Sequence, residues 1–157
     1  MKADQIRNLY EYHFALNRKV WDEAVSQLSD DQFVQDMGYS VGSVRNQIVH
    51  MIDTDLRWFS GLIGEEPPGF SNPVYFGKQR GKVLAYRQET DAMMQKILDG
   101  LDDEAVNAPY DTLIAWQVLV HVVTHSIDHR AQLLAMLNQF GVETFAQDYA
   151  LYLFGRI

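Results

Sequence analysis

Residues 121–132, "HVVTHSIDHRAQ", place three histidines at intervals of four: His121, His125 and His129. The chain has only five histidines in all, so their grouping needs an explanation. Apolar residues recur at helical spacing over roughly 112–140, which predicts one long helix around this segment. Two interpretations follow. The rings line one helix face and hold a metal, or they form a weakly polar seam in a buried helix.

At 100° per residue, the long helix separates its side chains into two stripes. One stripe is apolar: Trp116, Val120, Val123, Ile127, Leu134 and Leu137. The other is polar: Gln117, His121, Thr124, His125, Asp128, His129 and Gln132. A polar helix face ordinarily meets solvent. This one carries imidazoles, amides and a hydroxyl with a single carboxylate, and that composition favours a face that lines a cavity.

Three further segments show the same helical periodicity, and no segment alternates like a strand. They cover about 3–28, 43–63 and 78–98, with Ser43 as the expected N-cap of the second and Gly64 as its terminator. The tail "FAQDYALYLF" permits a short final helix. We therefore expect an all-α fold, one four-helix bundle domain spanning 1–157. The Pro-rich stretch "GEEPPGFSNPVYFG" is long enough to serve as a crossover connection between the second and third helices.

Composition narrows the possible partners. The net charge of −8 repels phosphate, so a nucleic-acid partner is not expected. No apolar run is long enough to cross a bilayer and no signal peptide is visible, so we expect a cytoplasmic protein without a membrane partner. The absence of cysteine removes thiolate ligands, a cysteine nucleophile and disulfides. Any bound metal must then use nitrogen and oxygen ligands.

Histidines four apart on a helix can share one ion, and the spacing permits the pair His121 with His125 or His125 with His129. Such a pair is weak evidence by itself, and a third ligand from another helix would strengthen it. His50 is the best candidate, on a face shared with Ser43, Gln47, Thr54 and Arg57. On spacing alone, His50 is better explained as a core-edge histidine. The same explanation is stronger still for His13 on the first helix.

These residues resemble the motifs of the DinB/YfiT-like family of metal-dependent four-helix bundles. The second-helix pattern S-V-x-x-x-x-x-H corresponds to Ser43, Val44 and His50, and the fourth-helix pattern H-x-x-x-H-R-x-Q corresponds to His125, His129, Arg130 and Gln132. The stretches "ALNRKVWD" and "GVETFAQDYALYLF" are similar to the family's first helix and tail, so the likeness spans nearly the whole chain. Two positions depart from the family pattern, which often has Gly in place of Ala131 and His in place of Asp128.

The resemblance implies that His50, His125 and His129 bind a divalent transition metal, with zinc or nickel the best candidates. Three imidazoles leave an open coordination position, as in catalytic sites. The family then implies a thiol-dependent transferase, with a small-molecule substrate and a low-molecular-weight thiol as cosubstrate, and a hydrolase fits the same ligands. It also implies a homodimer. The catalytic residues are unknown, and possible supporting residues are His121, Asp128, Gln132 and Asp53.

Other roles remain open for these residues and for the protein. A solvated surface acid is the alternative for both Asp53 and Asp128. Arg130 points about 100° from His129 and is expected in an ion pair or an interface contact. A bundle that binds a metal or ligand without turnover, with a role in stress response or sequestration, is the alternative function. A purely structural bundle, with its histidines satisfied by hydrogen bonds, is a third.

Overall fold

The computed structural model describes all residues, 1–157, and its architecture is helical. The four long helices are α1 (Ala3–Glu23), α3 (Val44–Leu62), α4 (Arg80–Gly100) and α6 (Ala115–Gln139). The short elements between and after them are η1 (Val25–Gln27), α2 (Asp30–Val34), η2 (Pro73–Phe76), α5 (Asp103–Val106), β1 (Pro109–Tyr110), β2 (Leu113–Ile114) and α7 (Tyr149–Leu153). This arrangement confirms the predicted all-α bundle. No helix combines the length and apolar composition needed to span a bilayer.

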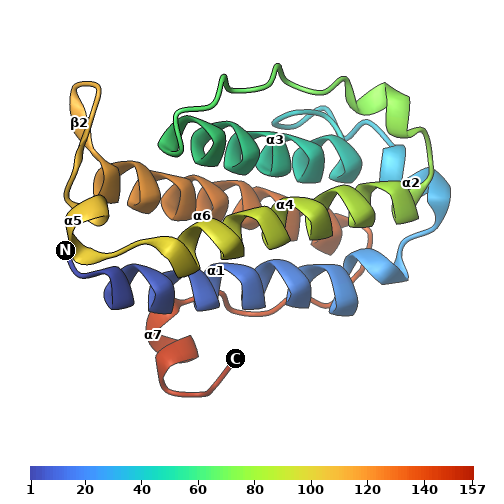
Figure 1. Ribbon diagram of the computed structural model, residues 1–157. Coiled ribbons are helices and arrows are strands. Elements are labelled where there is room, and N and C mark those ends of the chain that lie inside the picture. Colours follow the sequence, from blue (N-terminus) through green and yellow to red (C-terminus); the bar gives the residue numbers. More distant parts are fainter.

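The four long helices do not follow a simple up-and-down order (Figure 1). α1 and α6 run in one direction, while α3 and α4 run in the other. Since α3 and α4 are parallel neighbours, the chain must return along the whole length of α3 before α4 begins. The segment 63–79, which includes η2, makes this return over the outer side of α3. The Pro-rich stretch is therefore the crossover connection that the sequence permits.

The ends of α3 follow their expected chemistry. Ser43 caps the helix, because its hydroxyl accepts a hydrogen bond from the amide of Asn46 at 3.2 Å. Gly64 follows the helix with a φ of 76°, a left-handed conformation that glycine adopts without strain. Helix α1 is shorter than expected, because the chain turns at Ala24 into a 3-10 turn. Helix α6 begins at Ala115, later than expected, because the preceding residues form the hairpin of β1 and β2. Each strand has only two residues, too few to show an alternation of polar and apolar side chains.

The core of α6 lies to one side of the apolar stripe expected from the sequence. Val123, Leu134 and Leu137 are buried, but Trp116, Val120 and Ile127 are only partly covered. The centre of the buried face is made instead by Val118, Leu119, Val122, Ser126, Arg130, Leu133 and Met136. Two fully buried polar side chains thus belong to the core of the bundle. Because Ser126 and Arg130 are buried, the buried face of α6 is rotated away from the apolar stripe that hydrophobicity alone predicts.

Arg130 is one of these buried residues, and its partners are not the ones expected. Its guanidinium is fully buried and donates to Gln147 Oε1 at 2.8 Å, Asn17 Oδ1 at 2.8 Å and the Tyr12 hydroxyl at 3.2 Å. All three acceptors are neutral and belong to the same chain. The expectation of an ion pair or an interface contact is therefore wrong for Arg130. Through Gln147, this side chain connects the C-terminal segment to α1 and α6.

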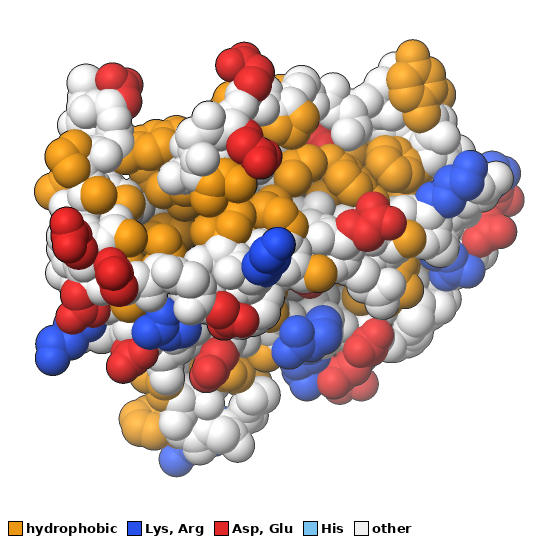
Figure 2. All heavy atoms as spheres, viewed as in Figure 1, with side chains coloured by type: hydrophobic (Ala, Val, Ile, Leu, Met, Phe, Trp, Pro, Cys, Tyr) orange, Lys and Arg blue, Asp and Glu red, His pale blue; other side chains and the backbone are white.

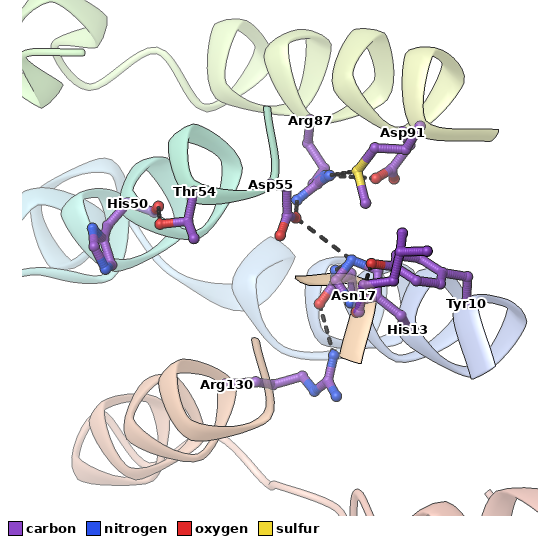
Figure 3. A network of polar contacts seen from close by, with 11 residues as sticks. Tyr10, His13, Asn17, His50, Thr54, Asp55, Arg87, Asp91 and Arg130 are labelled. Atoms are coloured by element: carbon purple, nitrogen blue, oxygen red, sulfur yellow. Dashed lines mark hydrogen bonds and ion pairs between the residues drawn. The ribbon is translucent and has the colours of Figure 1, made fainter. Parts of the chain in front are cut away.

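A second buried polar group crosses the bundle from α4 to α1 (Figure 3). The Arg87 guanidinium lies 2.6 Å from Asp55 Oδ2 and 2.5 Å from Asp91 Oδ1. Asp55 also lies 3.5 Å from Nε2 of His13, and both side chains are completely buried. Burial would raise the pKa of Asp55, but Arg87 and then His13 outweigh it and lower that pKa. Asp55 is therefore held as a carboxylate inside the bundle.

Candidate metal centre

The structure brings together the three histidines that the sequence singled out on two helices. His50 comes from α3, and His125 and His129 come from successive turns of α6, the helix that packs antiparallel against α3. Their ring centroids are 4.3 Å apart for His125 and His129, 4.5 Å for His50 and His129, and 5.1 Å for His50 and His125. One nitrogen from each ring lies within 4.8 Å of the others, so the three rings face a common point.

The three rings fit a divalent transition ion. Each is half-buried, and one ring nitrogen, His125 Nδ1, is buried without a hydrogen-bond partner. A tetrahedral ion with bonds of about 2.0–2.1 Å separates its ligand atoms by roughly 3.4 Å, so small side-chain rotations would close the group. Metal ligation requires neutral imidazole, and the surroundings favour that form. The donor set of three nitrogens is typical of zinc and nickel.

The electrostatics of the group keep the rings uncharged. Burial, followed by the neighbouring His129 and His50, lowers the pKa of His125 to about 4. Burial also lowers the pKa of His50, and burial together with His50 lowers that of His129. Opposite effects from Asp53 and Asp55 on His50 are smaller. Three adjacent imidazoles cannot readily all be protonated, because their positive charges would repel one another. The group can therefore bind a cation only when the rings are neutral.

This proton balance gives a stability prediction. In metal-free protein, the unfolded chain takes up a proton on His125 near pH 6.5, whereas the folded ring resists protonation until about pH 4. The folded state therefore loses stability as the pH falls through that window. Because the ring is half exposed, screening reduces the full value of the shift to about 1–2 kcal/mol.

Urea unfolding at pH 7 and pH 4.5 measures this effect, with the His125→Gln variant as the reference. The loss of unfolding free energy between the two pH values is expected to be about 1–2 kcal/mol smaller in the variant. If the unfolding free energy depends on pH identically in both proteins, the pKa of His125 is not lowered by folding, because the remaining titrating groups are common to the two.

Gln47 and Ser40 support the group, and sequence spacing assigned no role to either of them. Gln47 is fully buried, and its side-chain nitrogen lies 2.6 Å from Nδ1 of His129 and 3.1 Å from the carbonyl oxygen of that residue. A neutral His129 that binds an ion through Nε2 carries its hydrogen on Nδ1, so the Gln47 side chain would then present its amide oxygen to that N–H group. Ser40 has a left-handed φ of 52°, and its hydroxyl oxygen lies within hydrogen-bond distance of both glutamine side chains, at 3.0 Å from Gln47 Oε1 and also next to Gln132 Oε1. Ser40 and the two glutamines thus fix one side of the centre.

The other sequence candidates lie at different distances from the three rings. Gln132 accepts from Gln47 at 3.3 Å and so belongs to the support just described. His121 is exposed, and its ring lies against Trp58 at 5.2 Å and at 5.9 Å from His125, along the edge of the group. Asp128 is exposed beside His129, and its charge offsets a small part of the lowering of that ring's pKa. These side chains surround the centre without closing it.

Asp53 and His13 have partners elsewhere in the fold. The buried Asp53 carboxylate accepts from the Ser71 amide and hydroxyl, both at 2.8 Å, and from the Tyr86 hydroxyl at 2.7 Å. It therefore fastens the crossover connection to α3 and α4, and its hydrogen bonds do not go to His50. Burial and this bond help to raise the pKa of Tyr86 to about 12. His13 contacts Asp55 in the core, and it is not a member of the three-histidine group.

A cavity of about 280 Å³ lies next to the centre, under the crossover connection. Its lining comprises Thr54, Arg57, Trp58, Pro67, Phe70 and Tyr110. Thr54 is one turn beyond His50 and donates to the carbonyl oxygen of that residue, while the Phe70 ring is stacked against His50 at 6.1 Å. The Arg57 guanidinium lies over the Phe70 ring, 4.6 Å from its centroid. A small molecule in this cavity would lie beside His50, the member of the group that these lining residues contact.

The fold and this site together define a helical bundle with an open, three-histidine group able to hold a metal ion. A family model described as the DinB family matches residues 1–156. The chain belongs to the DinB family, as the histidine motifs predict. It is similar to the uncharacterized protein YizA of Bacillus subtilis (strain 168), with 25% identity over 129 residues, 79% of this chain and 80% of that protein. It is also similar to protein DinB of the same strain, with 25% identity over 169 aligned positions, 97% of this chain and 95% of that protein.

Proposed function

We propose that the protein is a metal-dependent enzyme that transfers a small-molecule thiol to an electrophile or hydrolyses a small substrate. The convergence of His50, His125 and His129 beside a cavity is the observation that carries this proposal. With zinc or nickel held by three imidazoles, one coordination position would stay open, and the metal would lower the pKa of a thiol or water bound there. His50, His125 and His129 would hold that ion, and we propose that they are its ligands.

The chain's own residues would bind and orient the substrate. The aromatic side chains of Trp58, Phe70 and Tyr110 offer apolar surface, and Arg57 supplies the positive charge of the cavity. Arg57 also donates to the carbonyl oxygen of Pro68, so the crossover connection fixes its position. A substrate with an apolar part and a negatively charged group matches this lining.

The lack of a carboxylate in the cavity lining favours a second candidate, a bundle that binds a metal or a ligand without turnover. Thr54 and Tyr110 supply the hydroxyl groups of the lining, and no acidic residue of the lining could act as general base. Such a protein would sequester its ligand, and stress response is one setting for that role. The two candidates share the same three ligands and differ in turnover.

Activity measurements on metal-loaded protein separate the two candidates. Zinc- or nickel-loaded protein is incubated with glutathione, bacillithiol or mycothiol and with chlorodinitrobenzene, monochlorobimane or an epoxide, and separately with a p-nitrophenyl ester. Turnover is expected in native protein and in His121→Ala, and a loss of at least about 100-fold is expected in His125→Ala. Protein that holds one ion per chain but turns over nothing would support the binding candidate. Equal activity in native protein and His125→Ala would contradict the proposed site.

We also propose that the protein forms a homodimer, as the family resemblance implies. Figure 2 shows hydrophobic side chains gathered in a band between α3 and α4, with charged side chains around it. Two exposed aromatic residues of the crossover connection add apolar surface: Phe70, which lines the cavity, and Tyr75 in η2. Light scattering coupled to gel filtration is expected to give twice the chain mass of 18.1 kDa. A monomer at micromolar concentration would contradict this proposal.

A further inference from the structure

A second and larger cavity, of about 320 Å³, lies inside the bundle and opens between α1 and α4. All four long helices contribute to its walls, and it shares no lining residue with the cavity beside the histidines. Its volume falls at the lower end of the range for small-molecule sites, and helix bundles hold such sites between their helices. The proposed function does not use this cavity, so any role of the cavity must be inferred from its own lining.

The cavity has one polar and one apolar end. Helices α1 and α4 run in opposite directions (Figure 1), so the later residues of α1 lie along the earlier residues of α4. Asn17 therefore lies toward the end of the cavity that holds Arg87 and Asp91, and Trp21, one turn later, toward the end that holds Leu84. Ile48, Met51 and Leu133 complete the apolar lining together with Val20. The opening is flanked by the exposed side chains of Arg18, Asp22 and Gln88. Such a division suits a molecule with an apolar body and one polar head.

The polar end carries an unused hydrogen-bond donor. Arg87 is buried, and its two terminal nitrogens contact Asp55 and Asp91, but its Nε has no hydrogen-bond partner. In Figure 3 the side chains of Arg87, Asp55 and Asn17 converge from three helices on the same region, while His50 points away from it. A buried N–H group without an acceptor is costly, so an acceptor is needed at Arg87 Nε. Apart from the ion pair of Asp91 with Arg87, Asp55 Oδ1 and Asp91 Oδ1 at this end also lack hydrogen-bond partners and would accept from a donor on the same ligand.

The charges near the polar end favour an anion as that acceptor. Asp55 and Asp91 are already paired with Arg87, whereas the buried guanidinium of Arg130 has only neutral partners. Arg18 adds a second positive charge at the opening on the same turn of α1 as Asn17. The one other acid of the lining, Asp22, is on the turn that carries Trp21, at the apolar end. A carboxylate at this end would therefore meet the guanidinium groups of Arg130 and Arg18, which have no carboxylate partners, and the unused N–H at Nε of Arg87.

We infer that this cavity binds a small amphipathic carboxylic acid, with its carboxylate between Arg87 and Arg18 and its body against Trp21 and Leu84. A volume of about 320 Å³ equals roughly ten water molecules at 30 Å³ each, enough for a short fatty acid or an arylacetic acid. The site is independent of the three histidines. Binding is therefore expected to be the same in metal-free and zinc-loaded protein.

Calorimetric and NMR titrations with hexanoate and phenylacetate test this inference, with hexylamine as the cationic counterpart of hexanoate. Saturable binding of both acids is expected, with hexylamine at least about tenfold weaker. Leu84→Trp fills the apolar end and is expected to weaken acid binding at least about tenfold. Arg18→Glu reverses the charge at the opening and is expected to weaken it by about fivefold, while the matched change Lys96→Glu, at an exposed position outside the lining, leaves it unchanged.

Circular dichroism of each variant verifies that the bundle is folded, since Arg18 and Lys96 are exposed and Leu84 is only partly buried. Three results would overturn the inference. The native protein binds neither acid, which would mean that water fills the cavity. Leu84→Trp binds the acids as tightly as native protein, which would place them elsewhere. Hexylamine binds as tightly as hexanoate, which would remove the role of the guanidinium groups.

Discussion

Replacement of His125 by alanine is expected to lower the affinity for zinc or nickel by more than about 100-fold. Loss of a residue that merely supports a ligand commonly costs 10–100-fold, and a direct ligand is worth more. His125 also lies within 5.1 Å, centroid to centroid, of both other rings, so its removal leaves His50 and His129 as a two-nitrogen site. Untagged native protein is expected to hold one ion per chain by elemental analysis, and chelator competition gives the affinity of each variant.

His121→Ala is the matched control, because it removes the same side chain four residues earlier on the same helix. His121 is exposed and lies 5.9 Å from His125, outside the group of three. Its loss is expected to leave the stoichiometry unchanged. If native protein cannot be loaded with either metal, or if both alanine variants bind it equally, the three-histidine centre is not a metal site.

Replacement of Arg87 by methionine is expected to lower the free energy of unfolding by about 3–5 kcal/mol. The change leaves the completely buried Asp55 carboxylate with only His13 as a possible counterion. Removing one partner of a buried ion pair costs this much because the other charge remains in a poorly solvated place. The urea denaturation midpoint, taken with an unchanged slope, measures the loss.

Two further variants show whether this cost comes from the stranded charge. Arg45→Met removes a guanidinium that bonds to the carbonyl of Gly77 and the side chain of Asn46, and it is expected to cost less than about 1 kcal/mol. Adding Asp55→Leu to Arg87→Met removes the uncompensated carboxylate and is expected to restore part of the stability. If Arg87→Met lowers the free energy of unfolding by no more than Arg45→Met does, the pairing of Arg87 with Asp55 makes no special contribution to stability.

The sequence predicts the long helices and the pairing of His125 with His129 for the same reason. Helical periodicity depends on residues three and four apart, and so does the alignment of His125 with His129. His50 was placed with them only through the family resemblance, because periodicity cannot show which faces of two helices meet. The hairpin of β1 and β2 escaped prediction because strands of two residues have no detectable alternation.

The buried polar residues could not be predicted because their partners are distant in the chain. Asp55 and Arg87 are separated by 32 positions, and Arg130 and Asn17 by 113, so no local pattern connects them. Gln47 was placed on the same face as His50, but its contact with His129 spans 82 positions. Asp53 was expected near His50 from its spacing, and its hydrogen bonds reach the crossover connection instead.

That connection decides how this site can change over evolution. A bundle whose second and third helices were antiparallel would join them by a short turn at one end, with no spare chain over the histidines. Here Pro67 and Phe70 belong to the crossover connection, which lies outside the four long helices and covers the cavity. Insertions and deletions in this connection can change which small molecules the cavity accepts, while the helices that carry the three histidines keep their packing.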